Sequence, residues 1–337
     1  MGSVTARVLE LAEENMKNRE NASMASQLFR RYEKNPILTA ADWPYEANAV
    51  FNPGAVQFEG ETLLLVRVED MRGFSHLAVA RSKDGKRDWR TNQQPALRPD
   101  PNFREERWGI EDPRIVWLEE EQRYAVTYVC FSRDGPVVAL AFTEDFTTFE
   151  RLGRLLPPED KDASLFPRRF KGRFALIHRP FLRGEGNIYI SFSPDLRHWG
   201  GHRVLLPVRP GSWDGDRVGL GAQPVETPEG WLIIYHGIRR TASGSLYRIG
   251  LALLDLEEPW RVVYRSDEWV LAPREIYERV GDVPGVVFPC GAVVDRETNE
   301  LRLYYGAADT CVGLAIADMA DVMDYVRSCP SPDGLES

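Results

Sequence analysis

The sequence predicts an all-β protein, a five-bladed β-propeller preceded by an N-terminal helical extension. Three observations predict this fold. A β-rich run recurs about every 50 to 60 residues, and a second apolar strand with an Asp turn recurs behind it. Helical spacing of apolar residues is confined to the start of the chain. Five blades of this length fit a propeller with long loops better than a β-sandwich with accidental repeats.

The N-terminal extension covers residues 1–34. Between Val4 and Tyr32, apolar residues lie at roughly helical spacing with charges between them, and glycine and proline are absent. We expect one or two amphipathic helices there. Their apolar stripe must be buried on the propeller or on a second subunit. The sequence therefore allows a homo-oligomer formed through these helices.

Residues 35–337 make up the predicted propeller domain. Its recurring strands are rich in Leu, Ile, Val, Tyr and Phe, and each follows a turn-like segment such as Lys171-Gly172. These strands are Thr62–Val68, Arg123–Cys130, Arg173–His178, Trp231–His236 and Leu301–Tyr305. We interpret them as the inner strands of five blades.

The second repeated element is an apolar strand that ends in an aspartate, with an aromatic residue a few positions later. Its copies are Asp84 with Trp89, Asp145 with Phe149, Asp195 with Trp199, and Asp255 with Trp260. We expect each aspartate to initiate a turn and each aromatic ring to fill the space between neighbouring sheets.

The composition is that of an acidic globular protein. Of the 337 residues, 43% are hydrophobic and 28% are charged, which is sufficient for a large core. The net charge of −9 disfavours nucleic acid as a partner, because proteins that bind it usually carry an excess of basic residues. The chain shows no signal peptide and no apolar run near the roughly 20 residues of a membrane helix. We expect a cytoplasmic protein without a membrane partner.

The four cysteines are Cys130, Cys290, Cys311 and Cys329. They form no CxxC pair and show no metal-site spacing with histidine. We therefore expect buried free thiols, no disulfide and no metal centre.

The densest polar motif runs from Trp108 to Arg114. Within it, Asp112 precedes a proline, which sets an extended backbone. Glu111 is its neighbour, and a nearby like charge can raise one carboxyl pKa, as a general acid requires. Taken alone, the motif is more simply explained as an Asp-Pro turn with a solvated carboxylate.

A basic group accompanies this candidate acid. Lys161, Arg179, Arg217 and His236 all lie at equivalent ends of predicted blade strands, which point at one axis. Each basic residue alone is more simply a surface ion-pair partner. Four potential cations that converge in an acidic protein indicate an anion site, and phosphate is the natural candidate.

Beyond these clusters, short motifs follow one another in a characteristic order. They are Asn52-Pro53-Gly54, Glu111-Asp112-Pro113-Arg114, Lys161-Asp162-Ala163 with Phe166-Pro167, His178-Arg179-Pro180, Trp213-Asp214 with Gly219, Tyr235-His236-Gly237, Phe288-Pro289-Cys290-Gly291 and Tyr304-Tyr305-Gly306-Ala307-Ala308-Asp309. Together, though not singly, they resemble glycoside hydrolase family 130, the β-mannoside phosphorylases and related β-mannosidases. The resemblance covers roughly residues 35–326.

The resemblance implies a five-bladed propeller and inverting cleavage of β-mannosides by inorganic phosphate, a co-substrate, with no further cofactor. It implies that Asp112 is the catalytic acid, which protonates the glycosidic oxygen through the mannose 3-hydroxyl, and that α-mannose 1-phosphate is the product. The implied phosphate ligands are Lys161, Arg179, Arg217 and His236, with Lys and Arg exchanged at Lys161 and Arg217 relative to the family pattern. The implied substrate-binding residues are Asn52, Arg67, Glu111, Asp162, Tyr247 and Asp309.

Other functions remain open at this stage. A β-mannosidase of the same fold would need a carboxylate in the phosphate site, for which Glu69, Asp214 or Asp216 could serve. A non-catalytic glycan-binding propeller would need aromatic platforms such as Trp108 or Trp213. A furanosidase-like propeller would need three separated carboxylates at the axis, and no convincing set is present. The linkage of the mannoside, β-1,2 or β-1,4, and the leaving sugar are not determined by these residues.

Overall fold

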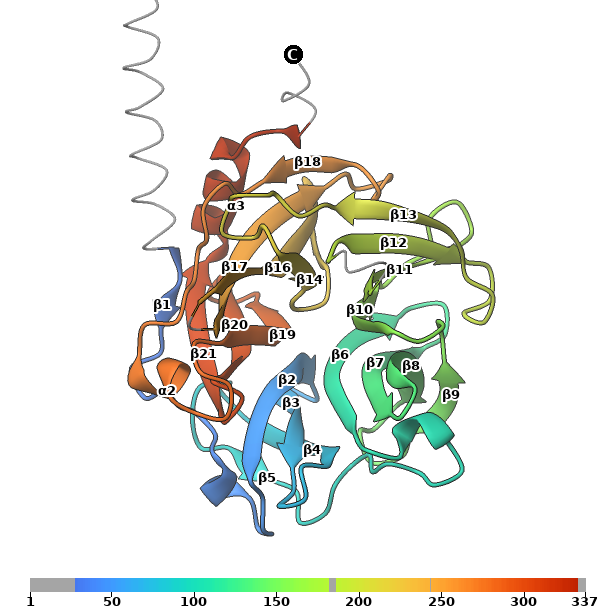
Figure 1. Cartoon of the computed structure of the whole chain (residues 1–337), viewed down its shortest axis with the longest axis vertical. Coiled ribbons are helices and arrows are strands. Elements are labelled where there is room, and N and C mark those ends of the chain that lie inside the picture. The colour runs from blue at the N-terminus through green and yellow to red at the C-terminus, as the bar shows by residue number, and fades with distance from the viewer. Residues whose placement is uncertain (1–27, 182–185, 243, 333–337) are drawn as a thin grey trace, which may run out of the picture.

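The computed structural model describes residues 28–181, 186–242 and 244–332. It confirms the five-bladed propeller: five antiparallel sheets surround a central axis, with one strand of each sheet facing that axis (Figure 1). From the axis outward, the first blade consists of β2 (Ala49–Phe58), β3 (Glu61–Glu69), β4 (Ser75–Ser82) and β5 (Arg90–Thr91). The second blade consists of β6 (Ile110–Leu118), β7 (Arg123–Ser132), β8 (Gly135–Thr143) and β9 (Glu150–Arg154). The third blade consists of β10 (Asp160–Leu165), β11 (Phe174–Pro180), β12 (Ile188–Ser193) and β13 (Gly200–Leu206).

The fourth and fifth blades complete the ring. The fourth blade consists of β14 (Arg217–Leu220), β16 (Gly230–Thr241), β17 (Gly244–Leu254) and β18 (Val262–Arg265), with β15 (Val225–Thr227) beside β16. The fifth blade consists of β19 (Val287–Asp295), β20 (Glu300–Ala307), β21 (Cys311–Asp318) and β1 (Arg30–Arg31). Short helices at Ala40–Asp42, Arg104–Glu106 and α2 (Ile276–Arg279), and α3 (Met319–Ser328), lie outside the sheets.

The recurring strands predicted as inner strands are in fact the second strand of each blade. They correspond to β3, β7, β11, β16 and β20, whereas β2, β6, β10, β14 and β19 line the axis. The second strands are buried on both faces and so give the strongest apolar signal. The axial strands carry the polar side chains of the site, which conceals their β character in the sequence.

The predicted Asp turns are confirmed in all four copies. In each, the aspartate Oδ1 accepts a backbone N–H from two residues further on, at 2.8–3.0 Å. The aromatic residue that follows packs against the preceding blade: the rings of Trp260 and Phe192 lie 5.6 Å apart, edge to face. The core therefore consists of apolar clusters between neighbouring blades rather than one central cluster.

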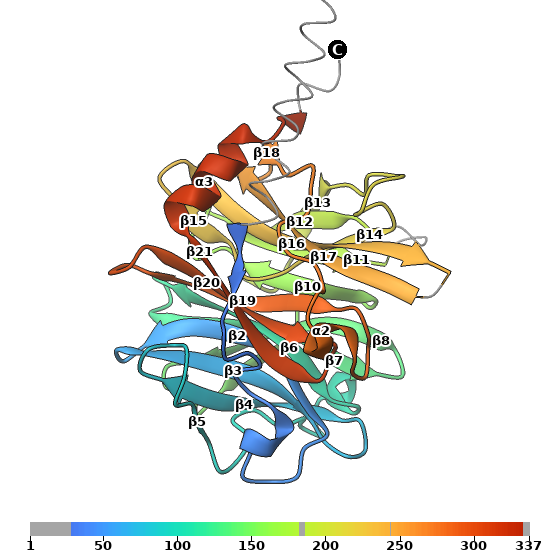
Figure 2. The same cartoon turned by 90° about the vertical axis from the view of Figure 1, so that its left-hand side faces the viewer.

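The first described strand closes the ring. Strand β1 pairs with β21, so that the N-terminal end of the chain supplies the outermost strand of the last blade (Figure 2). The Arg31 side chain donates to both carboxylate oxygens of the buried Glu278 at 2.7 and 2.8 Å. Phe29 is 5% exposed and packs between the fourth and fifth blades.

This closure corrects part of the sequence prediction. The helices expected over residues 1–34 fall mostly on residues 1–27, outside the described residues, but Arg30–Arg31 are a strand. Their backbone groups are paired with β21, which overrides the local helical pattern. Helix α3, which the sequence analysis did not predict, begins at the N-cap Asp318 and buries Val322, Tyr325 and Val326.

Two further expectations concern cysteines and membranes. All four cysteines are free and buried, as predicted. Among the described residues, no helix is both long enough and apolar enough to cross a bilayer.

Candidate active site

A bulge recurs near the start of the axial strands and aims side chains at the axis. The register of the axial strand shifts by an extra residue at Phe51/Gly54 in β2, Glu111/Arg114 in β6 and Lys161/Ser164 in β10. The bulged residues Asn52, Asp112 and Asp162 have φ values of 47°, 50° and 53°. Asn and Asp are the residues, after glycine, that best tolerate this left-handed conformation. The backbone therefore explains the residue type at all three positions.

Asp112 lies at the centre of a small polar group and is 3% exposed. Its Oδ1 accepts from Asn52 Nδ2 at 2.9 Å and from Arg67 Nη1 at 3.2 Å. Arg67 also donates from Nη2 to Glu111 Oε1 at 3.0 Å and from Nε to Ser75 Oγ at 2.9 Å, with its guanidinium over the Phe51 ring. Asn52, Arg67 and Glu111, predicted to lie near Asp112, are thus held with it in one network.

The pKa values of the two adjacent carboxyl groups, Glu111 and Asp112, shift in opposite directions. Burial and the neighbouring Asp112 raise the pKa of Glu111, against the effect of Arg67 and Lys161. Burial alone would raise the pKa of Asp112 too, but Arg67, Arg114, Lys161 and the Asn52 hydrogen bond lower it below the ordinary value. The sequence argument that the pair raises one carboxyl pKa is correct, but in the free protein that carboxyl is Glu111.

Asp309 faces the same group from the fifth blade. It follows strand β20 with φ of 49° and is partly exposed. Burial raises the pKa of Asp309 to about 6, against Arg67 and Lys161 and with the help of Asp112 and Glu111.

Arg179 stands opposite, on β11, paired in register with Lys161 on β10. Its Nε donates to Asp162 Oδ2 at 2.7 Å, and its Nη1 has no hydrogen-bond partner among the described residues. Asp162 is fully buried, and Arg179, Lys161 and His236 hold its pKa well below the usual range despite burial. Asp162 was predicted to bind substrate; the structure places it behind Arg179, where it fixes the guanidinium.

Arg217 completes the cationic side from the fourth blade. The guanidinium groups of Arg179 and Arg217 lie 4.7 and 5.6 Å from the centre of the same Phe181 ring. Burial, Arg240 and Arg179 lower the pKa of Arg217. Within the described ranges neither Arg217 nor Lys161 forms an ion pair with a carboxylate closer than 4 Å. Of the three cations on this side of the site, only Arg179 is ion-paired within those ranges, with Asp162.

His236 belongs to this group but is not a cation. Burial lowers the pKa of His236 to about 3, and Arg179 and Lys161 contribute to the decrease. Both ring nitrogens lack hydrogen-bond partners among the described residues, and Nε2 lies 3.6 Å from Asp162 Oδ2. The prediction of four converging cations is therefore corrected to three cations and a neutral imidazole.

Lys161 connects the two halves of the site. Its charge influences the pKa values of Glu111, Asp112 and Asp309 on one side and of Asp162 and His236 on the other. The ring of Tyr247, on β17, lies 5.8 Å from the His236 ring. The structure thus gathers all the predicted site residues around one end of the axis.

Arg114 is a member of the site that sequence reasoning missed. Its buried guanidinium extends across the axis to the fourth blade, where Nε and Nη2 donate to the carbonyls of Gly221 and Leu220 at 2.9 and 3.0 Å. Nη1 donates to the carbonyl of Asp112 at 2.9 Å. Arg114 stands in the Asp112 motif, but its partners in the fourth blade are more than 100 residues distant in sequence, so the sequence analysis assigned it no role.

Two of the residues named for the rival functions, Asp214 and Trp213, are enclosed by the fold. Asp214 is fully buried and bound by Arg209, Arg265 and Tyr235, so it cannot activate water. Trp213 is 4% exposed and therefore offers no platform to a sugar. Glu69 lies 3.7 Å from Nη2 of Arg67, the arginine that also donates to Asp112.

Comparison with known proteins identifies the family. The model of the β-1,4-mannooligosaccharide phosphorylase family, glycoside hydrolase family 130, matches residues 19–328. A β-1,4-mannooligosaccharide phosphorylase from Ruminococcus albus is 38% identical over 309 residues, which cover 88% of this chain and 90% of that protein.

Solved structures of family members also resemble this chain. A β-1,2-mannobiose phosphorylase from Listeria innocua, in complex with β-1,2-mannobiose, superposes with a TM-score of 0.81 at 32% identity, covering 89% of this chain and 99% of that one. A second structure comes from work on family members that are glycoside hydrolases targeting β-1,2 mannosidic linkages; it superposes with a TM-score of 0.76 at 27% identity, covering 86% and 93%. The chain belongs to glycoside hydrolase family 130.

Proposed function

We propose that this enzyme is an inverting β-mannoside phosphorylase that releases α-mannose 1-phosphate. The observation that carries the proposal is the asymmetry of the axial site. Asp112, held by Asn52 and Arg67, faces three cations, Lys161, Arg179 and Arg217, of which only Arg179 forms an ion pair within 4 Å among the described residues. The relatives named as mannoside phosphorylases support the same reaction.

The chemistry of inversion explains why this asymmetry matters. An inverting hydrolase needs an acid and a second carboxylate to activate water. A phosphorylase needs only the acid, because phosphate is itself a nucleophile, but it needs cations that hold the dianion against the sugar. In the described part of the chain, Nη1 of Arg179 has no hydrogen-bond partner while Nε is fixed by Asp162, an arrangement that suits an anion with two acceptor oxygens.

In the proposed reaction, Asp112 gives its proton to the 3-hydroxyl of the mannosyl unit, and that hydroxyl gives its own to the glycosidic oxygen. Phosphate attacks C1 from the opposite face, the C1–O bond breaks and the saccharide leaves as an alcohol. Asn52, Arg67, Glu111, Tyr247 and Asp309 bind the sugars.

The low pKa of Asp112 in the free protein is compatible with this role. Lys161 is one of the cations that lower it. Bound phosphate neutralises part of that charge, and the bound sugar excludes water, so both co-substrates raise the pKa of Asp112. The acid then becomes competent only when both are present.

The test is an assay of β-1,4- and β-1,2-linked mannobiose with and without phosphate. We expect cleavage only with phosphate, and mannose 1-phosphate as the product. Free mannose released at the same rate without phosphate would instead establish a β-mannosidase, with Glu69 as the first candidate base.

The pKa of Asp309 gives a prediction on pH. The ionised carboxylate accepts sugar hydroxyls, so we expect kcat/KM for the mannoside to decrease as pH falls through about 6. Phosphate also titrates in this range, so the diagnostic is the comparison with Asp309→Asn, whose profile should lack that inflection. His236 does not contribute, because its pKa is about 3. An unchanged profile in Asp309→Asn would contradict the assignment.

A further inference from the structure

One residue of the His178-Arg179-Pro180 motif has no role in the site described above. His178 lies on β11 directly before Arg179 and is 3% exposed. Its Nδ1 lies 2.6 Å from Asp160 Oδ2, and its Nε2 lies 2.7 Å from Ser191 Oγ. Because both ring nitrogens are engaged, the orientation of this imidazole is fixed.

The hydrogen-bonded chain around His178 crosses the third blade from the axis to the solvent. Asp160 is the first residue of the axial strand β10, and Ser191 lies on β12. Ser191 Oγ also lies 2.6 Å from Nδ1 of the exposed His202 on β13. All four strands of the blade are therefore joined by side chains as well as by the backbone ladder.

The proton positions along this chain follow from the number of donors. An ionised Asp160 only accepts, so His178 Nδ1 carries a proton and donates to it. In the neutral ring Nε2 is then an acceptor, so Ser191 donates its single hydroxyl proton to Nε2 and accepts from His202. Burial raises the pKa of Asp160, and the hydrogen bond from His178 opposes that rise most strongly. Asp160 Oδ1 has no hydrogen-bond partner among the described residues, so this buried carboxylate depends on His178.

The bond from His178 to Asp160 lies directly behind two of the cations of the site. Lys161 follows Asp160, Arg179 follows His178, and the two cations are paired in register across β10 and β11. Successive side chains of a strand point to opposite faces. Asp160 and His178 are therefore on one face of this pair of strands, and Lys161 and Arg179 are on the other. A shift of the start of β10 against β11 would change the spacing of both cations.

The same bond spans a break in the backbone pairing. The register of β10 with β11 shifts between Lys161 and Ser164, which leaves His178 opposite the bulge that carries Asp162. A bulge interrupts the backbone ladder, so a side-chain bond is needed to hold the strands together there. Asp162 in turn accepts from Nε of Arg179. The position of the bulge therefore sets the position of the guanidinium.

We propose that His178 is a positioning residue of the phosphate site. Through Asp160 it holds the bulged start of β10 against β11, which sets the distance between the Lys161 ammonium and the Arg179 guanidinium. The inference rests on the proposed function, because it takes these two cations to be phosphate ligands. His178 lies on the opposite face of the strands and acts only through them. It therefore affects the binding of phosphate and leaves that of the mannoside nearly unchanged.

Two substitutions of His178 distinguish positioning from a general contribution to stability. Asparagine places an amide N–H close to the position of Nδ1 and can still donate to Asp160, whereas glutamine reaches the position of Nε2 beside Ser191. We expect His178→Gln to raise the KM for phosphate about 10-fold or more, with little change in the KM for the mannoside, because small displacements of binding groups have large effects. His178→Asn should keep the KM for phosphate of the unmodified enzyme.

A third variant breaks the same bond from the other strand. Asp160→Ala removes the acceptor of His178 and leaves no buried carboxylate without a partner, so it keeps the test valid if His178→Gln does not fold. It should raise the KM for phosphate as His178→Gln does. Steady-state kinetics with phosphate and mannoside varied separately, together with melting temperatures, are the measurements.

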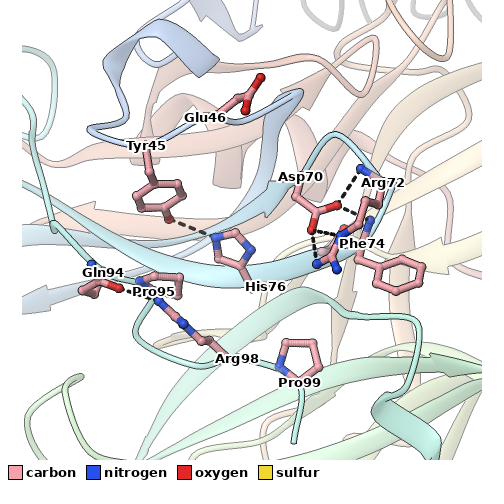
Figure 3. Close-up of a pocket in the computed structure, with 11 residues that line it drawn as sticks. Tyr45, Glu46, Asp70, Arg72, Phe74, His76, Gln94, Pro95, Arg98 and Pro99 are labelled. Atoms are coloured by element: carbon pink, nitrogen blue, oxygen red, sulfur yellow. Dashed lines mark hydrogen bonds and ion pairs between the residues drawn. The ribbon is translucent and has the colours of Figure 1, made fainter.

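The first blade supplies a control with the same substitution. His76 Nε2 lies 2.9 Å from Tyr45 Oη, and the nearby Asp70 is bound by Arg72 (Figure 3). Among the described residues His76 has no hydrogen-bonded carboxylate. His76→Gln should therefore leave the KM for phosphate unchanged.

A control for lost stability lies in the second blade. Tyr128 stands opposite the bulge of β6, and its Oη donates to Glu106 at 2.9 Å. Tyr128→Phe removes a buried hydrogen bond without affecting the strands that carry the cations, so the KM for phosphate should not rise. A rise of the same size in Tyr128→Phe, an equal rise in His178→Asn and His178→Gln, or no rise in either, would overturn the proposal.

Failure of the proposed function would be recognised separately. Calorimetric titration with inorganic phosphate does not depend on turnover. If no mannoside is phosphorolysed, weaker phosphate binding by His178→Gln and Asp160→Ala than by His178→Asn still supports the positioning role. Phosphate affinity that is equal in all three variants, or absent from the unmodified protein, overturns it.

Discussion

Replacing Asp112 by asparagine is expected to reduce kcat by about 10²–10⁴-fold, the usual loss when a general acid is removed. Folding should be preserved for two reasons. Asparagine tolerates the φ of 50° at this bulge, as Asn52 shows at the equivalent position of β2. Its amide oxygen can still accept from Asn52 Nδ2 and Arg67 Nη1. The measurements are mannose 1-phosphate release and the melting temperature.

Glu111→Gln is the matched control, because it alters the neighbouring carboxyl in the same way. We expect a smaller loss, expressed mainly in KM, since Glu111 binds Arg67 at the edge of the site rather than at its centre. An active Asp112→Asn enzyme would transfer the acid role to Glu111, whose pKa is the one raised in the free protein. The ratio of the activity lost in Asp112→Asn to that lost in Glu111→Gln therefore decides which carboxyl is the general acid.

Replacing Arg179 by lysine is expected to raise the KM for phosphate at least about 10-fold while that for the mannoside changes little. Lysine keeps the charge but loses the planar pair of donors, of which Nε binds Asp162 and Nη1 has no partner within the described ranges. Arg179→Glu should abolish phosphorolysis, because it places a negative charge beside the buried Asp162. Steady-state kinetics with phosphate and mannoside varied separately measure both effects.

Arg169 provides the control for Arg179 within the same blade. It also stacks on a phenylalanine and pairs with a carboxylate, but it lies away from the axial site. Arg169→Lys should leave both KM values unchanged. If Arg179→Lys behaved like Arg169→Lys, the phosphate site would have to lie elsewhere.

The repeat pattern was sufficient to predict the propeller, because turns and second strands have strong local signals. The Asp turns depend only on contacts within a few residues, and all four form as expected. The axial strands were misassigned because bulged polar residues, Asn52, Asp112 and Asp162, interrupt the apolar pattern of β2, β6 and β10. Strand β1 was missed because its partner β21 lies almost 300 residues later, and a distant pairing leaves no local pattern.

The position of the candidate site could be predicted from the sequence, but the charge states of its residues could not. Asn52, Asp112 and Arg179 were found from their motifs, because residue type and order along the chain are properties of the sequence. The neutral state of His236 depends on its complete burial, and the burial of Asp162 depends on packing between blades. Arg114 acts through backbone carbonyls of another blade, which are present at every residue and therefore carry no sequence signal.

The closing pair of β1 with β21 has a consequence for how the protein is made. During synthesis, the carboxylate and cationic halves of the site emerge with the first four blades, but Asp309 and the partner of β1 emerge last. Until β21 is available, the Arg31 strand has no partner in its sheet. Such long-range pairing slows folding. The nascent chain therefore reaches a working catalytic centre only near the end of translation, and premature release would yield an open ring with an exposed sheet edge, which favours aggregation.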